Sequence, residues 1–221
     1  MNTTDSRKKN IFITLAITGT LALSWLIGGY AGGPALAADW GSTLLLRSWL
    51  ALPGVDVDST DNVDNTALCN AVSNGNTECA QVLIQAGANI NHRGSSGWTP
   101  LMKAAENGHI DCIQALIAAG ADVNKGNDSG CISLHAAAQY GNPVCVQALI
   151  AAGANVNTAD KWGYTPLHRA TLNNQAKCAE LLIAAGANLY AINGDGQTPL
   201  QMAIAFGSTD CARLLSQYGA R

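Results

Sequence analysis

The sequence contains few charged and few aromatic residues, and these shortages narrow the functions it can have. Only 12% of its 221 residues are charged and 5% are aromatic, whereas 48% are hydrophobic. A chain this rich in apolar side chains is not a disordered charged tail. Its net charge of −3 argues against nucleic acid as a partner, because phosphate binding needs a surplus of lysine and arginine on one face.

Recognisable catalytic and metal-binding motifs are missing as well. The sequence contains no G-x-S-x-G, no H-E-x-x-H and no phosphate-binding glycine loop. It has seven cysteines, an odd number, and no two of them form a CxxC pair. We therefore expect a protein that is not an enzyme and that needs neither a cofactor nor a metal ion.

Residues 1–37 are typical of an export signal. A basic segment, Arg7 to Lys9, precedes an uncharged apolar run over residues 11–33, and a small-x-small triplet follows at residues 35–37. This order predicts cleavage after Ala37 and places the rest of the chain outside the cytoplasm, in a bacterial periplasm or secreted. A retained transmembrane helix is the alternative, because the run is long enough to span a bilayer.

The remaining sequence repeats itself every 33 residues. Five segments with this step begin at Thr66, Thr99, Ile132, Thr165 and Thr198. A glycine and a cysteine recur with the same step, at Gly87, Gly120, Gly153, Gly186 and Gly219 and at Cys79, Cys112, Cys145, Cys178 and Cys211. Such a period indicates a solenoid in which each unit buries the apolar face of the next.

Each unit is predicted to contain two short helices and an extended finger. The opening threonine is suited to capping a helix, and the proline after it to the first helical position. Leu101, Ala104 and Ala105 then share one helical face, and Gly108 ends the helix. A second helix runs to Gly120, after which the chain extends outward and returns.

The repeat resembles the ankyrin repeat family. The motifs that carry the resemblance are TPLH at 165–168, TPL at 99–101 and 198–200, NGHIDC at 107–112 and LLIAAGAN at 181–188. The resemblance implies an all-α ankyrin-repeat solenoid over about residues 66–221, preceded by the apolar N-terminal helix. Its repeats would be 66–98, 99–131, 132–164, 165–197 and 198–221.

Some repeats depart from the family pattern. The first begins TALC, the third begins ISLH, and the fourth has Asn173-Asn174-Gln175 where the family usually shows x-Gly-His. These departures are expected to affect single turns. The resemblance also implies that His135 and His168, which end the TPLH-type motifs, form hydrogen bonds between neighbouring repeats.

Both ends of the solenoid are predicted to carry caps. Residues 38–65 read as a degenerate half-repeat, with one capping helix over 42–52 whose Leu45, Leu46, Trp49 and Leu50 pack against the first full repeat. At the other end Ser216 replaces the isoleucine that the earlier repeats have, which indicates that the fifth repeat is the last.

The repeated cysteine is predicted to be a buried packing residue. It lies in phase with the apolar face of the second helix, where the family usually has an aliphatic residue, and free cysteine behaves as a small hydrophobe. Stacked helices lie ~8–10 Å apart, whereas a disulfide needs Cα atoms within ~7 Å, so these thiols should remain unpaired. A thiol-based redox or metal protein is the alternative.

The family resemblance places recognition on a concave surface made by the fingers and the first helices. Trp162, Tyr164 and Tyr140 are the expected binding hot spot, because aromatic residues often anchor interfaces. For Trp98 and Tyr164, packing of the finger base is an equal alternative. The candidate positions are Arg93, Ser96, Trp98, Glu106, Asn107, Gln139, Tyr140, Lys161, Trp162, Tyr164, Leu172, Asn173, Asp195, Gln197 and Phe206.

These observations together predict an exported, non-catalytic monomer that binds a protein partner. We expect a periplasmic scaffold or protective partner, with no nucleic acid and no membrane contact beyond a possible N-terminal anchor. A secreted effector directed at a host is the alternative within the same fold.

Overall fold

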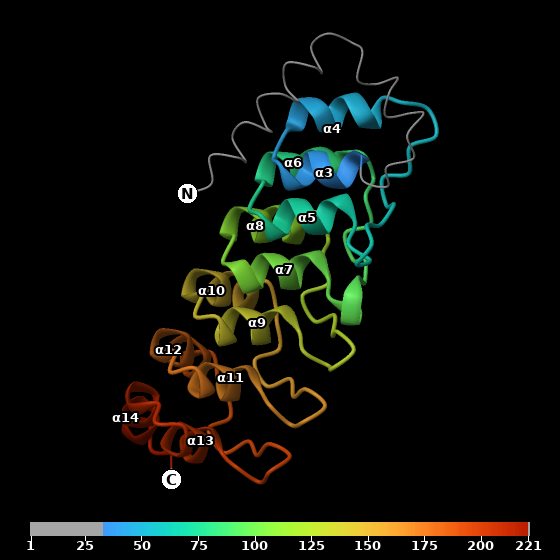
Figure 1. Cartoon of the computed structure of the whole chain (residues 1–221). Helices are drawn as coiled ribbons and strands as arrows, with labels where there is room; N and C mark the ends of the chain where they lie inside the picture. Colours follow the sequence, from blue (N-terminus) through green and yellow to red (C-terminus); the bar gives the residue numbers. More distant parts are fainter. Residues whose placement is uncertain (1–32, 221) are drawn as a thin grey trace, which may run out of the picture.

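The structure is a computed structural model that describes residues 33–220, so most of the predicted export signal lies outside the described residues. Within 33–220 there are twelve α-helices and one short 3-10 helix, and no strand is formed. Figure 1 shows the helices stacked in successive pairs along one axis. The all-α repeat architecture is therefore confirmed for this part of the chain.

The helix pairs follow the chain in order. They are α3 (Gly33–Asp39) with α4 (Thr43–Leu50), α5 (Ala67–Ser73) with α6 (Thr77–Gln85), α7 (Pro100–Asn107) with α8 (Ile110–Ala118), α9 (Ser133–Gln139) with α10 (Pro143–Ala151), α11 (Pro166–Leu172) with α12 (Ala176–Ala184), and α13 (Pro199–Ala205) with α14 (Thr209–Gln217). First helices pack on first helices and second helices on second helices. The 3-10 helix η1 (Ser95–Gly97) lies in the finger before α7.

The predicted helix boundaries have the expected chemistry. Thr99 Oγ1 accepts a hydrogen bond from the backbone N–H of Met102 at 3.3 Å, and Pro100 occupies the first turn of α7. Gly108 ends this helix with a φ of +76°, which favours glycine. Ile132 has no hydroxyl, and here Nδ1 of His135 accepts the Ile132 N–H at 3.2 Å.

The departure in the fourth repeat leaves its turn intact. Asn174 stands where other repeats have glycine and adopts a φ of +52°, a region that asparagine tolerates better than most residues. Its Oδ1 accepts a hydrogen bond from the N–H of Cys211 at 3.2 Å. The turn is therefore tied to the fifth repeat by the side chain that replaces glycine.

The repeated cysteines lie in the shared core, as predicted. Cys79, Cys112, Cys145, Cys178 and Cys211 are all buried, and each is a free thiol. Burial raises the pKa of these thiols, to about 11 for the last two. A protonated, buried thiol is a packing group rather than a nucleophile.

The N-terminal cap differs from the single helix expected over 42–52. That segment contains α4, in which Leu46 is buried, but a second helix, α3, precedes it and packs against α5. Ala37 and Ala38 of α3 are 3% and 0% exposed. The expectation was too short because Pro34 to Ala37 was assigned to the export signal.

The bond pattern around α3 repeats that of an internal unit. The Asn76 side-chain amide donates to the carbonyls of Ala38 and Asp39, at 2.8 and 3.0 Å. In the middle of the stack, Asn142 donates in the same way to Ala105 and Glu106, at 2.9 and 3.0 Å. The cap is therefore a complete helix pair, and Ala38 holds the place of Ala105.

The fingers are joined to one another by a regular column of hydrogen bonds. An Asp or Asn side chain in each finger accepts a backbone N–H from the next finger, and the paired atoms lie 2.8–2.9 Å apart. The acceptors are Asp58, Asn91, Asn124 and Asn157, and the donors are Asn89, Asp122, Asn155 and Asn188. The column ties the fingers into one continuous surface.

Candidate protein-binding surface

The finger between α10 and α11 is held by a buried acidic residue. Oδ1 of Asp160 accepts the backbone N–H groups of Trp162 and Tyr164, both at 2.9 Å, and Oδ2 pairs with Arg169 of α11. The Asp160 side chain is fully buried. Burial alone favours the neutral acid, but the bonds from Arg169 and the two N–H groups outweigh it, and the pKa of Asp160 lies below its ordinary value.

Trp162 is presented to solvent by this arrangement. Its side chain is 55% exposed, although its N–H is bonded to Asp160 and its carbonyl accepts the N–H of Gly194 at 2.6 Å. Tyr164, in contrast, lies half-buried under Arg169, whose guanidinium carbon is 4.8 Å from the ring centroid. The finger thus combines a fixed backbone with one outward aromatic side chain.

The finger between α8 and α9 is tied to the finger before it by charge. Arg93 pairs with Asp128 at 2.6 Å, and the N–H of Asp128 bonds to the carbonyl of Ser96 at 3.0 Å. Both charged side chains are largely exposed, so this pair contributes only a few tenths of a kcal/mol, about the value of surface ion pairs. Its main effect is to hold the finger tips together.

Trp98 takes part in a second charged contact. The ammonium group of Lys103 lies 4.6 Å from the Trp98 ring centroid and 3.2 Å from a carboxylate oxygen of Glu106. Trp98 is half-buried. It therefore packs at its finger base, in a cation–π contact with α7.

Tyr140 belongs to a different neighbourhood from Trp162. Burial and a hydrogen bond to the carboxylate of Glu106, one repeat earlier, raise its pKa. Since Tyr164 lies under Arg169, the three expected hot-spot residues face different groups. Tyr140 and Trp162 both remain half or more exposed, at 50% and 55%.

None of the fifteen expected surface residues is buried. Arg93, Ser96, Asn107, Tyr140, Lys161, Trp162, Asn173, Asp195 and Phe206 are exposed, whereas Trp98, Glu106, Gln139, Tyr164, Leu172 and Gln197 are half-buried. All of them lie on fingers or on the ends of first helices. These residues lie between Arg93 and Phe206, and the largest exposed aromatic side chains among them are Tyr140, Trp162 and Phe206.

Sequence reasoning missed Asp160 and Arg169, which position this surface. A weak signal existed, because a finger-base residue and a first-helix residue nine positions later meet in three repeats. The residue types differ each time: Asp61 with Asn70, Asp160 with Arg169, and Asn193 with Met202. Only the spacing recurs, so a search for a constant motif does not find it.

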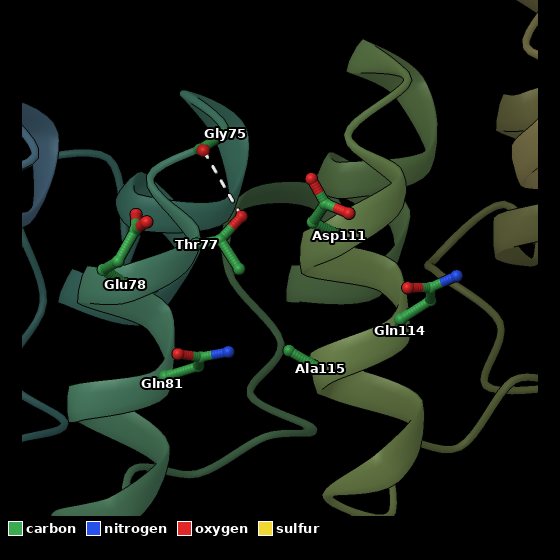
Figure 2. Close-up of a pocket in the computed structure, with 7 residues that line it drawn as sticks. All are labelled: Gly75, Thr77, Glu78, Gln81, Asp111, Gln114 and Ala115. Carbon is green, nitrogen blue, oxygen red and sulfur yellow. Dashed lines mark hydrogen bonds between the residues drawn. The ribbon is translucent and has the colours of Figure 1, made fainter.

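A separate groove lies between the second helices α6 and α8. It is lined by Gly75, Thr77, Glu78, Gln81, Asp111, Gln114 and Ala115. Figure 2 shows the carboxylates of Glu78 and Asp111 on neighbouring helices, with two glutamine amides below them. The groove is open and offers hydrogen-bonding groups, and no cluster of three or more metal-ligating side chains occurs anywhere in residues 33–220.

The two buried histidines serve the fold. Nε2 of His135 bonds to the carbonyl of Tyr164 at 3.0 Å, and Nε2 of His168 bonds to that of Gln197 at 3.2 Å. These carbonyls lie directly before the next repeat, as the resemblance implied. Burial lowers the pKa of His135 to about 4, so this ring is neutral at pH 7.

Comparison with known families agrees with the geometry. A family model described as ankyrin repeats, in three copies, matches residues 35–127 and 134–221. The match begins at residue 35 and includes most of α3, whose residues up to Ala37 the sequence predicts to be part of the export signal. None of the curated proteins matches the chain.

Proposed function

Because the chain belongs to the ankyrin repeat family, whose repeats generally mediate protein–protein interactions, we propose that it binds a protein partner through its finger and first-helix surface. Members of the family are typically non-catalytic scaffolds, and the neutral, bonded histidines described above suit that role. The partner would lie along the concave side of the stack.

The presentation of Trp162 carries this proposal. Trp162 is a large aromatic side chain that is 55% exposed, and its backbone is already fixed by Asp160. It therefore loses little further conformational freedom on binding, so that more of its contact energy appears as affinity. Tyr140 and Phe206, at 50% and 61% exposure, offer separate aromatic contacts at the ends of the first helices α9 and α13. The partner is expected to place apolar side chains against these three.

We further propose that the protein is exported and acts outside the cytoplasm as a scaffold or protective partner. The support is the basic segment followed by the apolar run over residues 11–33. The thiol-based alternative is less well supported, because the five repeated cysteines are buried and their raised pKa values disfavour the reactive thiolate.

A photoreactive amino acid at position 162 tests the binding surface. The protein it captures in the source cells would be purified and titrated against the wild type and against Trp162→Ala. A hot-spot residue predicts at least about tenfold weaker binding by the variant. Val144→Ala is the matched control, because Val144 is 61% exposed but lies on the second helix α10. Equal losses in both variants would reject the proposed surface.

A further inference from the structure

The predicted signal cleavage falls inside a folded helix. Cleavage after Ala37 breaks the bond to Ala38, and both residues belong to α3. They are 3% and 0% exposed, and α3 packs against α5 as each later first helix packs against its neighbour. The two alanines are the small buried pair that lets first helices approach closely.

Such a cut would place a charge where the fold has none. The new chain would begin at Ala38 with a protonated amine, and the cut would also remove residues 33–37, the greater part of α3. Burying an unpaired ammonium group is strongly unfavourable, and the first residues would detach instead. Detachment would uncover the side of α5 that now packs against α3.

Backbone carbonyl groups of α3 also accept hydrogen bonds from the first full repeat. Asn76 donates to the carbonyls of Ala38 and Asp39, and Asn74 donates to the side chain of Asp39 at 2.6 Å. A frayed α3 would leave the half-buried Asn76 amide without these acceptors. The N-terminal unit therefore needs the residues that precede Ala38.

We propose that the chain is not cut after Ala37 and that the apolar run over residues 11–33 stays attached as a membrane anchor. No helix among residues 33–220 is long and apolar enough to cross a bilayer. The run over residues 11–33 carries no charge and is long enough for a hydrocarbon core of about 30 Å. Because α3 begins at Gly33, the run and the first helix of the stack are adjacent in the sequence.

This inference rests on the proposed export, since the positively charged start sets which side of the membrane the stack occupies. The full chain with a C-terminal tag would be expressed in a Gram-negative bacterium, and its intact mass and membrane association measured. The expected product has the mass of all 221 residues, sediments with membranes, resists carbonate extraction and dissolves in detergent. A soluble product that begins at Ala38 would overturn the inference, and so would a soluble product cut before Gly33.

Two readouts separate anchoring from export. Protease added to spheroplasts should digest the tagged stack. If the stack is full-length and membrane-bound but is protected from this protease, the anchor is supported and the proposed export is rejected. The variant Ala35→Leu removes a small residue that cleavage after Ala37 requires, and Ala35→Ser retains one. We expect the wild type and both variants to keep all 221 residues, so that their masses differ only by the substituted side chain. Retention of residues 1–37 in Ala35→Leu alone would show that the wild type is cut at this site.

Discussion

The fourth and fifth repeats place equivalent residues in opposite surroundings. His168 and Thr171 of the fourth repeat are fully buried, whereas Gln201 is exposed and Ile204 is 67% exposed in the fifth. The backbone of both first helices is alike, and both begin with a threonine cap. The difference arises because α13 covers the outer side of α11, whereas no further first helix among the described residues covers the outer side of α13.

The comparison teaches that burial in a stack is decided by the next unit rather than by a repeat's own sequence. The second helices agree, since the partly buried Ile183 packs against the core and its equivalent Ser216 is exposed. Of the three positions compared, Gln201 and Ser216 are polar in the fifth repeat and Ile204 is apolar. The predicted polar cap is present but incomplete.

Removing the fifth repeat should have the largest effect, because it turns the fourth repeat into the end of the stack. A chain ending at residue 197 would expose His168 and Thr171, both now 0% exposed, and Ile183, which now packs against the core. We expect aggregation in size-exclusion chromatography and a lower urea midpoint. A soluble, cooperatively unfolding 1–197 chain would mean that the fourth repeat caps itself.

One substitution at two equivalent positions sharpens the comparison. Ala138→Asp puts a carboxylate into a fully buried site of the third repeat and should destabilise the protein by about 3–5 kcal/mol. Ile204→Asp changes the same position in the fifth repeat, where it should alter the stability by less than about 0.5 kcal/mol. Urea unfolding of both variants measures this, and similar losses would contradict the role assigned to the covering repeat.

Substitution of one of the repeated cysteines should have a smaller effect on stability. Cys145→Ser places a hydroxyl with poor partners in the core and should cost roughly 1–3 kcal/mol. Cys131→Ser is the control, because Cys131 is half-exposed at a finger base. Labelling of native thiols should be fastest at Cys131 and slow at the repeated cysteines until denaturant is added.

The smallest effect is expected from pH. Since the folded pKa of His135 is lowered to about 4 from an ordinary value of 6.5, its contribution is present above pH 6.5 and is lost as the pH falls toward 4. At pH 6 the loss is under about 1 kcal/mol. His135→Gln, which imitates Gln201 of the fifth repeat, should make the unfolding free energy less dependent on pH between 6.5 and 4. An unchanged slope would exclude His135 as the titrating group.

The helix pairs from Thr66 onward were predictable because period, caps and apolar spacing agree with one another. The N-terminal pair was not, since Pro-Ala-Leu-Ala-Ala at residues 34–38 satisfies two descriptions at once. Small residues suit a signal peptidase, and they equally suit a crowded contact between first helices. Only the packing of Ala37 and Ala38 against α5 distinguishes the two.

The exposure of the candidate surface positions was predictable from the sequence, but their contacts were not. The resemblance placed Trp98, Tyr140, Tyr164 and Trp162 on this surface, and all four are at least partly exposed. Which of them is free for a partner depends on Lys103 and Arg169, because each of these cations lies over one aromatic ring. In each contact the cation lies five residues after the ring and on the following helix, and a family pattern does not contain these pairs.

The Asp and Asn column between the fingers has a mechanical consequence. Its acceptors lie 31 residues before their donors, so each bond crosses from one unit to the next, roughly along the long axis. A force that pulls the two ends of the protein apart would load these bonds in series, with one joint at every repeat. The stack would then extend as these bonds break one repeat at a time. A partner bound by several fingers would be released gradually rather than in one step.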